Sequence, residues 1–83
     1  MKIKPLQGII YLKIEEPKAG VLKSTTPAAI EYAEVLAVGE FVEGIRKGDH
    51  VFVKAWAIDN IVFEDKKYYF VAEETNGILA IVE

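Results

Sequence analysis

The sequence predicts an all-β protein, a small β-barrel with one long loop. Apolar residues never recur with a helical period over ten or more residues, whereas glycine, proline and polar clusters interrupt the chain at short intervals. The runs between these interruptions are rich in Ile, Val, Tyr and Phe, which suit a pleated and half-buried surface. At 83 residues the chain has the size of one domain with a single small core.

Composition excludes several classes of function. The net charge is −3, from 10 Lys and Arg against 13 Asp and Glu, so a basic surface for nucleic acid is not expected. No apolar run approaches the roughly 20 residues of a membrane span, and the N-terminus lacks the apolar core of a signal peptide, so we expect a soluble protein and no membrane partner. The absence of cysteine fits a reducing, intracellular location. Hydrophobic residues make up 52% of the chain, more than so small a core can hide, which predicts contact with another subunit.

The first part of the chain contains an extended edge piece and three strands. Pro5 lacks a backbone N–H and therefore belongs at a sheet edge or a strand end. Gly48 lies in a Lys-Gly-Asp turn that leads directly into a strand. The predicted elements are an extended piece at residues 3–6 and strands at residues 9–14, 32–38 and 50–54.

The second part predicts a hairpin and a terminal strand. Residues 58–63 and 68–71 read as a β-hairpin joined by a four-residue loop at residues 64–67. Residues 78–82 are five apolar residues in a row, so we expect both faces of this strand to be covered. An apolar terminal strand with an open edge invites pairing with another chain, which predicts a subunit interface. The alternative is a strand paired only inside its own barrel.

The loop at residues 15–33 is the longest segment without a strand pattern. Pro17, Gly20 and Pro27 interrupt any regular period. Connections of this length are usually functional or disordered. Val21 and Leu22 lie in its middle, and two interpretations remain open. Either the loop is mobile and orders when these side chains enter an apolar groove on a partner, or they pack back onto the barrel as single surface aliphatics do.

Catalytic and metal-binding patterns are absent from the sequence. Ser24 and His50 are the only serine and histidine, and Ser24 lies in the long loop rather than on a nucleophile elbow. The acids of the turns lack the spacing of a calcium-binding loop. Trp56 and the aromatics at residues 68–70 could form a stacking platform for bases, but the acidic balance favours packing roles. We therefore expect no catalytic residue, no metal site and no enzyme.

Six motifs, taken in order and spacing, resemble the GroES co-chaperonin family over nearly the whole chain. Each motif alone is weak, but the set is specific. They are Lys-Ile-Lys-Pro-Leu at residues 2–6, Ala-Gly-Val-Leu at 19–22, Glu-Val-Leu-Ala-Val-Gly at 34–39, Lys47-Gly48-Asp49 with Val51-Phe52, the Tyr68 strand, and Ile-Leu-Ala-Ile-Val-Glu at 78–83.

The resemblance implies a heptameric dome of β-barrels that caps a GroEL-type chaperonin ring and assists ATP-dependent protein folding. The chaperonin would bind the ATP, so this chain needs no cofactor of its own. The chaperonin-binding residues would be Gly20, Val21 and Leu22 in the mobile loop. Neighbouring subunits would pair the first strand of one with the last strand of the next. The implied interface residues are Ile3, Pro5, Leu6, Ile78, Leu79, Ala80, Ile81 and Val82.

Two departures from the family pattern are visible. The loop carries two aliphatics after Gly20 where the family has three, on a shorter lead. Residues 40–46 are too short for the family's roof hairpin, so the dome would be open or wider at its top. Such trimmed forms resemble phage-encoded co-chaperonins, which leaves a bacterial cytoplasm or that of a phage-infected host as the expected location. The alternatives are a monomeric SH3-like barrel that binds peptide or RNA, and a GroES-like piece of a larger enzyme.

Overall fold

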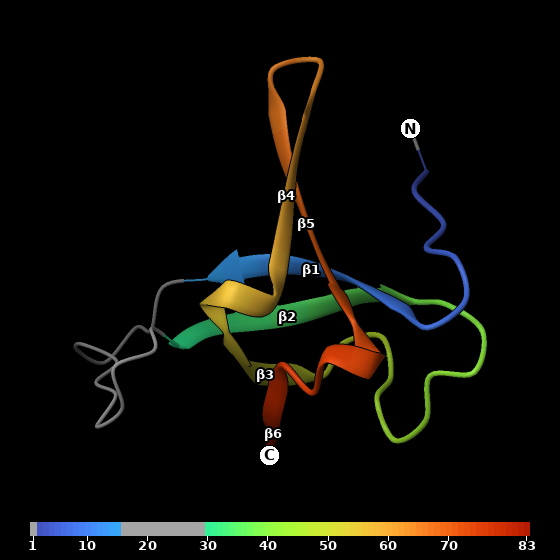
Figure 1. Cartoon of the computed structure of the whole chain (residues 1–83), viewed down its shortest axis with the longest axis vertical. Helices are drawn as coiled ribbons and strands as arrows, with labels where there is room; N and C mark the ends of the chain where they lie inside the picture. The colour runs from blue at the N-terminus through green and yellow to red at the C-terminus, as the bar shows by residue number, and fades with distance from the viewer. Residues whose placement is uncertain (1, 16–29) are drawn as a thin grey trace.

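A computed structural model describes residues 2–15 and 30–83, which form one antiparallel sheet (Figure 1). The sheet has six strands in the order β4-β5-β1-β2-β3-β6, so the all-β prediction is confirmed. The described residues contain no α-helix and no helix able to cross a bilayer. The elements are β1 (Ile9–Glu15), β2 (Ile30–Val38), β3 (His50–Lys54), η1 (Ala55–Ala57), β4 (Ile58–Phe63), β5 (Lys66–Ala72), η2 (Glu73–Thr75) and β6 (Ile78–Val82), where η denotes a single 3₁₀ turn.

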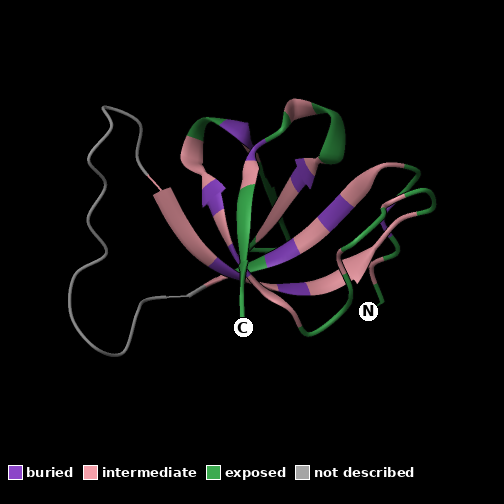
Figure 2. Cartoon of the chain, turned by 90° about the horizontal axis from the view of Figure 1, so that it is seen from below, coloured by how far each residue is buried: buried purple, intermediate pink, exposed green. Residues whose placement is uncertain are grey.

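The core lies inside the curl of this sheet, as the alternating burial along the strands shows (Figure 2). In β1 the side chains of Ile10 and Leu12 are buried, whereas those of Tyr11 and Lys13 lie on the outer face. The same two-residue alternation gives each central strand one face toward the core and one face toward the outside, so all the central strands share one small core. The buried apolar residues are Ile10, Leu12, Ala33, Val35, Val51, Val53, Ala57 and Val71.

Gly77 comes just before β6 in the chain and packs against Ala57 of η1. It is buried, and its carbonyl oxygen accepts a hydrogen bond of 2.8 Å from the backbone N–H of Lys54. A side chain at Gly77 would overlap the methyl group of Ala57 and lie 3.3 Å from a methyl of Val71. Only glycine fits this close approach. The sheet as a whole is curled, which is compatible with the predicted small barrel (Figure 2).

The two strands that flank the long loop are longer than predicted. β1 includes Glu15, and β2 begins at Ile30 rather than residue 32, so the described strands take up both ends of the predicted loop. The physical reason is a distant partner, because Ile30 pairs with Lys54 and Glu31 pairs with Val53. Pairing with β3, some twenty residues further along the chain, cannot be read from local composition.

The hairpin turn is shorter than predicted. Phe63 pairs with Lys66, which leaves Glu64 and Asp65 as a two-residue turn rather than the expected four-residue loop. Both turn residues have positive φ, 51° and 65°, as the tight turns that match strand twist require. Lys66 and Lys67 therefore belong to β5, in the part of the hairpin that extends away from the rest of the sheet (Figure 1).

The connection from β2 to β3 contains turns and no strand. The backbone N–H of Arg46 donates to a carboxylate oxygen of Asp49 at 2.9 Å, and Asp49 N–H donates to the Arg46 carbonyl at 3.1 Å. Gly48 has a φ of +96°, which explains the glycine of this turn. The prediction that this connection is too short for a roof hairpin is confirmed.

Candidate functional site

The base of the long loop is fixed by strand pairing. Glu15 pairs with Tyr32, Ile14 pairs with Ala33, and the ladder continues into the core through Leu12. Ala33 and Leu12 are buried, so the two ends of residues 16–29 are held side by side on a packed sheet. The predicted chaperonin-binding Gly20, Val21 and Leu22 lie outside the described residues, and their role stays a prediction.

The terminal strand β6 has an apolar surface that its own described chain does not cover. It pairs with β3 on one side, with Val51 opposite Ile81 and His50 opposite Val82, and β6 is the last strand at one end of the sheet. Leu79, Ile81 and Val82 remain 50%, 39% and 37% exposed, and Ala80 is exposed too. We predicted that both faces of this strand would be covered, and within the described residues that cover is missing. This leaves an apolar sheet edge of the kind that pairs with another chain.

The N-terminal segment, residues 2–6, forms no strand in the single chain. Its last residue is held by a turn, in which Ile9 N–H donates to the Leu6 carbonyl at 3.0 Å, and the Leu6 carbonyl packs closely on Gly39, whose N–H donates to the Ile9 carbonyl at 2.8 Å. Pro5 is buried in its own chain, Ile3 is half-buried, and Leu6 is 77% exposed. Of the predicted interface residues here, Leu6 is the most available to a neighbour, and the assignment of Ile3, Pro5 and Leu6 stays a prediction.

The two predicted interface surfaces lie on different sides of the molecule. Figure 1 places the N-terminal segment at the upper right of the view and the C-terminus, at the end of β6, at the lower edge. A contact between one surface of a subunit and the other surface of its neighbour is therefore head-to-tail. Head-to-tail contacts generate rings when the rotation between neighbours closes.

The aromatic residues do not gather into one stacking platform. Trp56 lies in η1 and is 62% exposed, with the amino group of Lys54 at 5.7 Å from its ring centroid. Tyr69 packs against the core, whereas the ring of Phe70 stacks on that of Tyr11 at 5.2 Å on the outer face. The platform considered for base stacking is therefore divided between faces.

His50 and the acidic residues have structural neighbours. The imidazole of His50 stacks on the ring of Tyr32, with centroids 5.5 Å apart and planes at 11°. A carboxylate oxygen of Glu73 accepts a hydrogen bond of 3.1 Å from the backbone N–H of Glu43. Across the described ranges, no group of three or more His, Cys, Asp or Glu could hold a metal ion. Ser24 lies outside those ranges.

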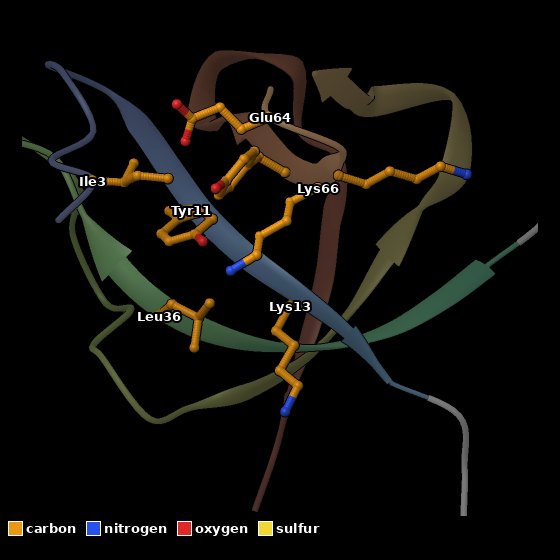
Figure 3. A pocket seen from close by; sticks show the side chains of 8 residues that line it. Ile3, Tyr11, Lys13, Leu36, Glu64 and Lys66 are labelled. Carbon is orange, nitrogen blue, oxygen red and sulfur yellow. The ribbon is translucent and has the colours of Figure 1, made fainter. Parts of the chain in front are cut away.

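One cavity was not predicted from the sequence. It has a volume of about 570 Å³ and lies on the outer face, between the N-terminal segment and the β4–β5 hairpin (Figure 3). Its lining joins residues from four separate segments, so no local motif could have indicated it. The residues that matter below are Ile3, Tyr11, Lys13, Lys66, Lys67 and Tyr68, together called the lysine pocket.

The fold and these surfaces define a class of protein. A small curled antiparallel sheet of six strands with an apolar terminal edge is compatible with a small β-barrel protein. No model of a known protein family matches the chain. Curated relatives do match it.

The chain is 36% identical to the protein named Co-chaperonin GroES of Finegoldia magna, over the full length of both. It is 36% identical to the Streptococcus pneumoniae protein of that name, with 98% of each chain covered, and 37% identical to that of Fusobacterium nucleatum subsp. nucleatum, with 99% covered. The chain therefore belongs to the GroES co-chaperonin family. These full-length matches favour the family over the SH3-like alternative.

The chain is a short member of this family. Its alignment with the Finegoldia magna relative covers all of both chains but spans 96 positions, so the relative carries residues that these 83 lack. The short connection between β2 and β3 agrees with that difference.

Proposed function

We propose that this chain is a co-chaperonin, which caps a GroEL-type chaperonin ring and assists protein folding in the enclosed chamber. The observation that carries this proposal is the match to co-chaperonins from several genera over essentially the whole chain. The chaperonin supplies ATP binding, and this chain acts through contacts alone, without a catalytic group. Its place of action is the cytoplasm, bacterial or that of a phage-infected host.

The segment at residues 16–29 docks on the chaperonin through Gly20, Val21 and Leu22. Support comes from its position, because β1 and β2 hold both of its ends side by side. Burying the two aliphatic side chains yields about 1.5–3 kcal/mol each. Ordering ten loop residues costs about 1 kcal/mol apiece. One loop therefore hardly binds alone.

Several loops on one ring overcome this cost. After the first loop docks, the others bind intramolecularly at high effective concentration, which turns a marginal contact into a tight and reversible one. A heptamer is the proposed ring, in which the N-terminal segment of each subunit pairs with β6 of the next. The exposed Leu6, Leu79 and Ile81 supply the apolar surface for this contact.

Two substitutions separate docking from assembly. Leu22→Asp removes an aliphatic anchor and should abolish ring binding while the oligomer stays intact. Ile81→Asp places a charge in the β6 edge and should break the oligomer. Lys23→Asp, in the same loop, is the matched control for the charge change and should retain most binding.

The assay is size-exclusion chromatography of each variant, alone and with a GroEL-type ring and ATP. Normal capping by Leu22→Asp would show that the anchor is assigned wrongly. An unchanged oligomer for Ile81→Asp would remove β6 from the interface.

A further inference from the structure

The lysine pocket has the opposite charge to the chain as a whole. Lys13, Lys66 and Lys67 line it against a single acid, Glu64, in a chain of net charge −3. All three lysines are exposed, so their ammonium groups keep their hydration and remain available. A concentration of one charge in a concave surface favours an anionic occupant.

The walls of the pocket are aromatic and aliphatic. The rings of Tyr11 and Tyr68 lie 6.3 Å apart on the outer faces of β1 and β5, and both residues are half-buried. Figure 3 shows Ile3 pointing toward Tyr11, with the side chain of Lys66 reaching across beside that ring. Such a site suits a carboxylate carried on a short aliphatic stem, because the stem packs on the rings while the charge meets the amino group of Lys66, which reaches beside Tyr11 (Figure 3).

Ile3 connects this pocket to the proposed subunit interface. It lines the pocket and belongs to the segment that pairs with β6 of a neighbour. β6 ends at Val82, and the next residue, Glu83, is an exposed acid. Residues opposite one another in paired strands lie about 5 Å apart, within the reach of a glutamate side chain.

We propose that Glu83 of a neighbouring copy of this chain places its carboxylate in the lysine pocket. The inference rests on the proposed ring assembly, and it adds the residue that sets the direction and register of the contact. An antiparallel arrangement brings Glu83 to the Ile3 end of the segment, beside the lysines. A parallel arrangement would bring it to Leu6, where Lys4 and Glu40 both line the neighbouring cavity and their charges offset each other, so no comparable attraction is available there.

Register follows from strand geometry. Residues directly opposite one another, and those two positions along, project from the same face of a sheet. Setting Glu83 or Ile81 opposite Ile3 turns the Glu83 side chain toward the pocket. Setting Val82 opposite Ile3 turns it away. The lysine pocket therefore selects between registers that differ by one residue.

Zero-length crosslinking tests this contact. Rings assembled from a mixture of unlabelled and ¹⁵N-labelled chains are treated with a carbodiimide, which joins a carboxylate to a lysine amine with loss of water. Mass spectrometry of the digest should find Glu83 of one isotope joined to Lys66, Lys67 or Lys13 of the other. Crosslinks that join Glu83 only to lysines outside the pocket overturn the proposal.

Charge variants give a second, independent measurement. Lys66→Glu should raise the concentration at which the oligomer dissociates by roughly tenfold, as expected for one lost interfacial charge pair. Lys47→Glu makes the same charge change on an exposed turn outside the lysine pocket and should leave it unchanged. Combining Lys66→Glu with Glu83→Lys should recover most of the loss, which a merely misfolded variant could not do.

The outcomes separate this inference from the proposed function. An intact wild-type ring in which Lys66→Glu behaves like Lys47→Glu overturns the pocket contact and leaves the ring in place. A wild-type protein that stays monomeric at all concentrations overturns the ring and the pocket contact together.

Discussion

Gly39 fixes the N-terminal segment against the end of β2, and Gly39→Ala tests how much that attachment contributes. A methyl group there would overlap the carbonyl oxygen of Leu6 and lie 2.7 Å from its carbonyl carbon and 3.1 Å from the Ile9 carbonyl oxygen. All of these are backbone atoms, so no side-chain rotation relieves the overlap. The segment that ends at Leu6 must move.

The cost follows from the hydrogen bonds at risk. They are Gly39 N–H to the Ile9 carbonyl at 2.8 Å, Gly8 N–H to the Glu40 carbonyl at 2.8 Å, and Ile9 N–H to the Leu6 carbonyl at 3.0 Å. At about 0.5–1.5 kcal/mol each, the loss of two or three lowers the free energy of unfolding by about 1–4 kcal/mol. The oligomer should weaken as well, because Leu6 leaves its place.

Urea denaturation of a double-mutant cycle measures the effect. The second variant is a chain that begins at Gln7, in which the Leu6 carbonyl is absent. Gly39→Ala should cost much less in that background than in the full chain. Equal costs in the two backgrounds would refute the reasoning, because the contact with Leu6 would then not be the cause.

Two further predictions separate core from surface. Leu12→Ala removes a fully buried side chain and should lower the free energy of unfolding by about 2–5 kcal/mol. Leu79→Ala, at a half-exposed position, should change the free energy of unfolding by less than about 0.5 kcal/mol and weaken the oligomer instead. Chemical denaturation measures the first effect and sedimentation velocity the second, and a large unfolding cost for Leu79→Ala would contradict its exposed position. Asp65→Gly should stabilise the protein by about 0.5–1 kcal/mol, because Asp65 has a φ of 65°, where relief of about 1–2 kcal/mol of left-handed strain exceeds the entropic cost of about 0.5–1 kcal/mol that glycine adds. A lower melting temperature would contradict the two-residue turn.

Local patterns predicted most of the strands correctly. The run from Ile9 and the strand at His50–Lys54 are bounded by glycine turns, and their side chains alternate between core and surface as a two-residue period requires. The terminal strand at Ile78–Val82 was predicted with its observed bounds. At these positions the local preference and the final pairing agree.

The sequence predictions were wrong at two strand boundaries, one set by a distant partner strand and one by the length of a local hairpin turn. Ile30 and Glu31 form strand because β3 pairs with them, although Pro27 and the polar run before them indicate loop. Lys66 and Lys67 resemble turn residues, yet they form strand because the hairpin extends into solvent, where charged side chains cost nothing.

The sequence predicted some parts of the candidate site and not others. The β6 edge followed from its five apolar residues, and the structure gives that edge an exposed apolar surface. The aliphatics Val21 and Leu22 were singled out from their place in the predicted loop, and the family resemblance then favoured docking over packing back onto the barrel. The lysine pocket could not be predicted, because Ile3, Lys13 and Lys66 are brought together only by the curl of the sheet.

Native mass spectrometry of the protein mixed with a GroEL-type ring and ATP tests the central claim most directly. We expect a heptamer of this chain on its own and, with the ring present, a complex in which one heptamer sits on the chaperonin. A monomer that leaves the chaperonin ring unoccupied would contradict the account.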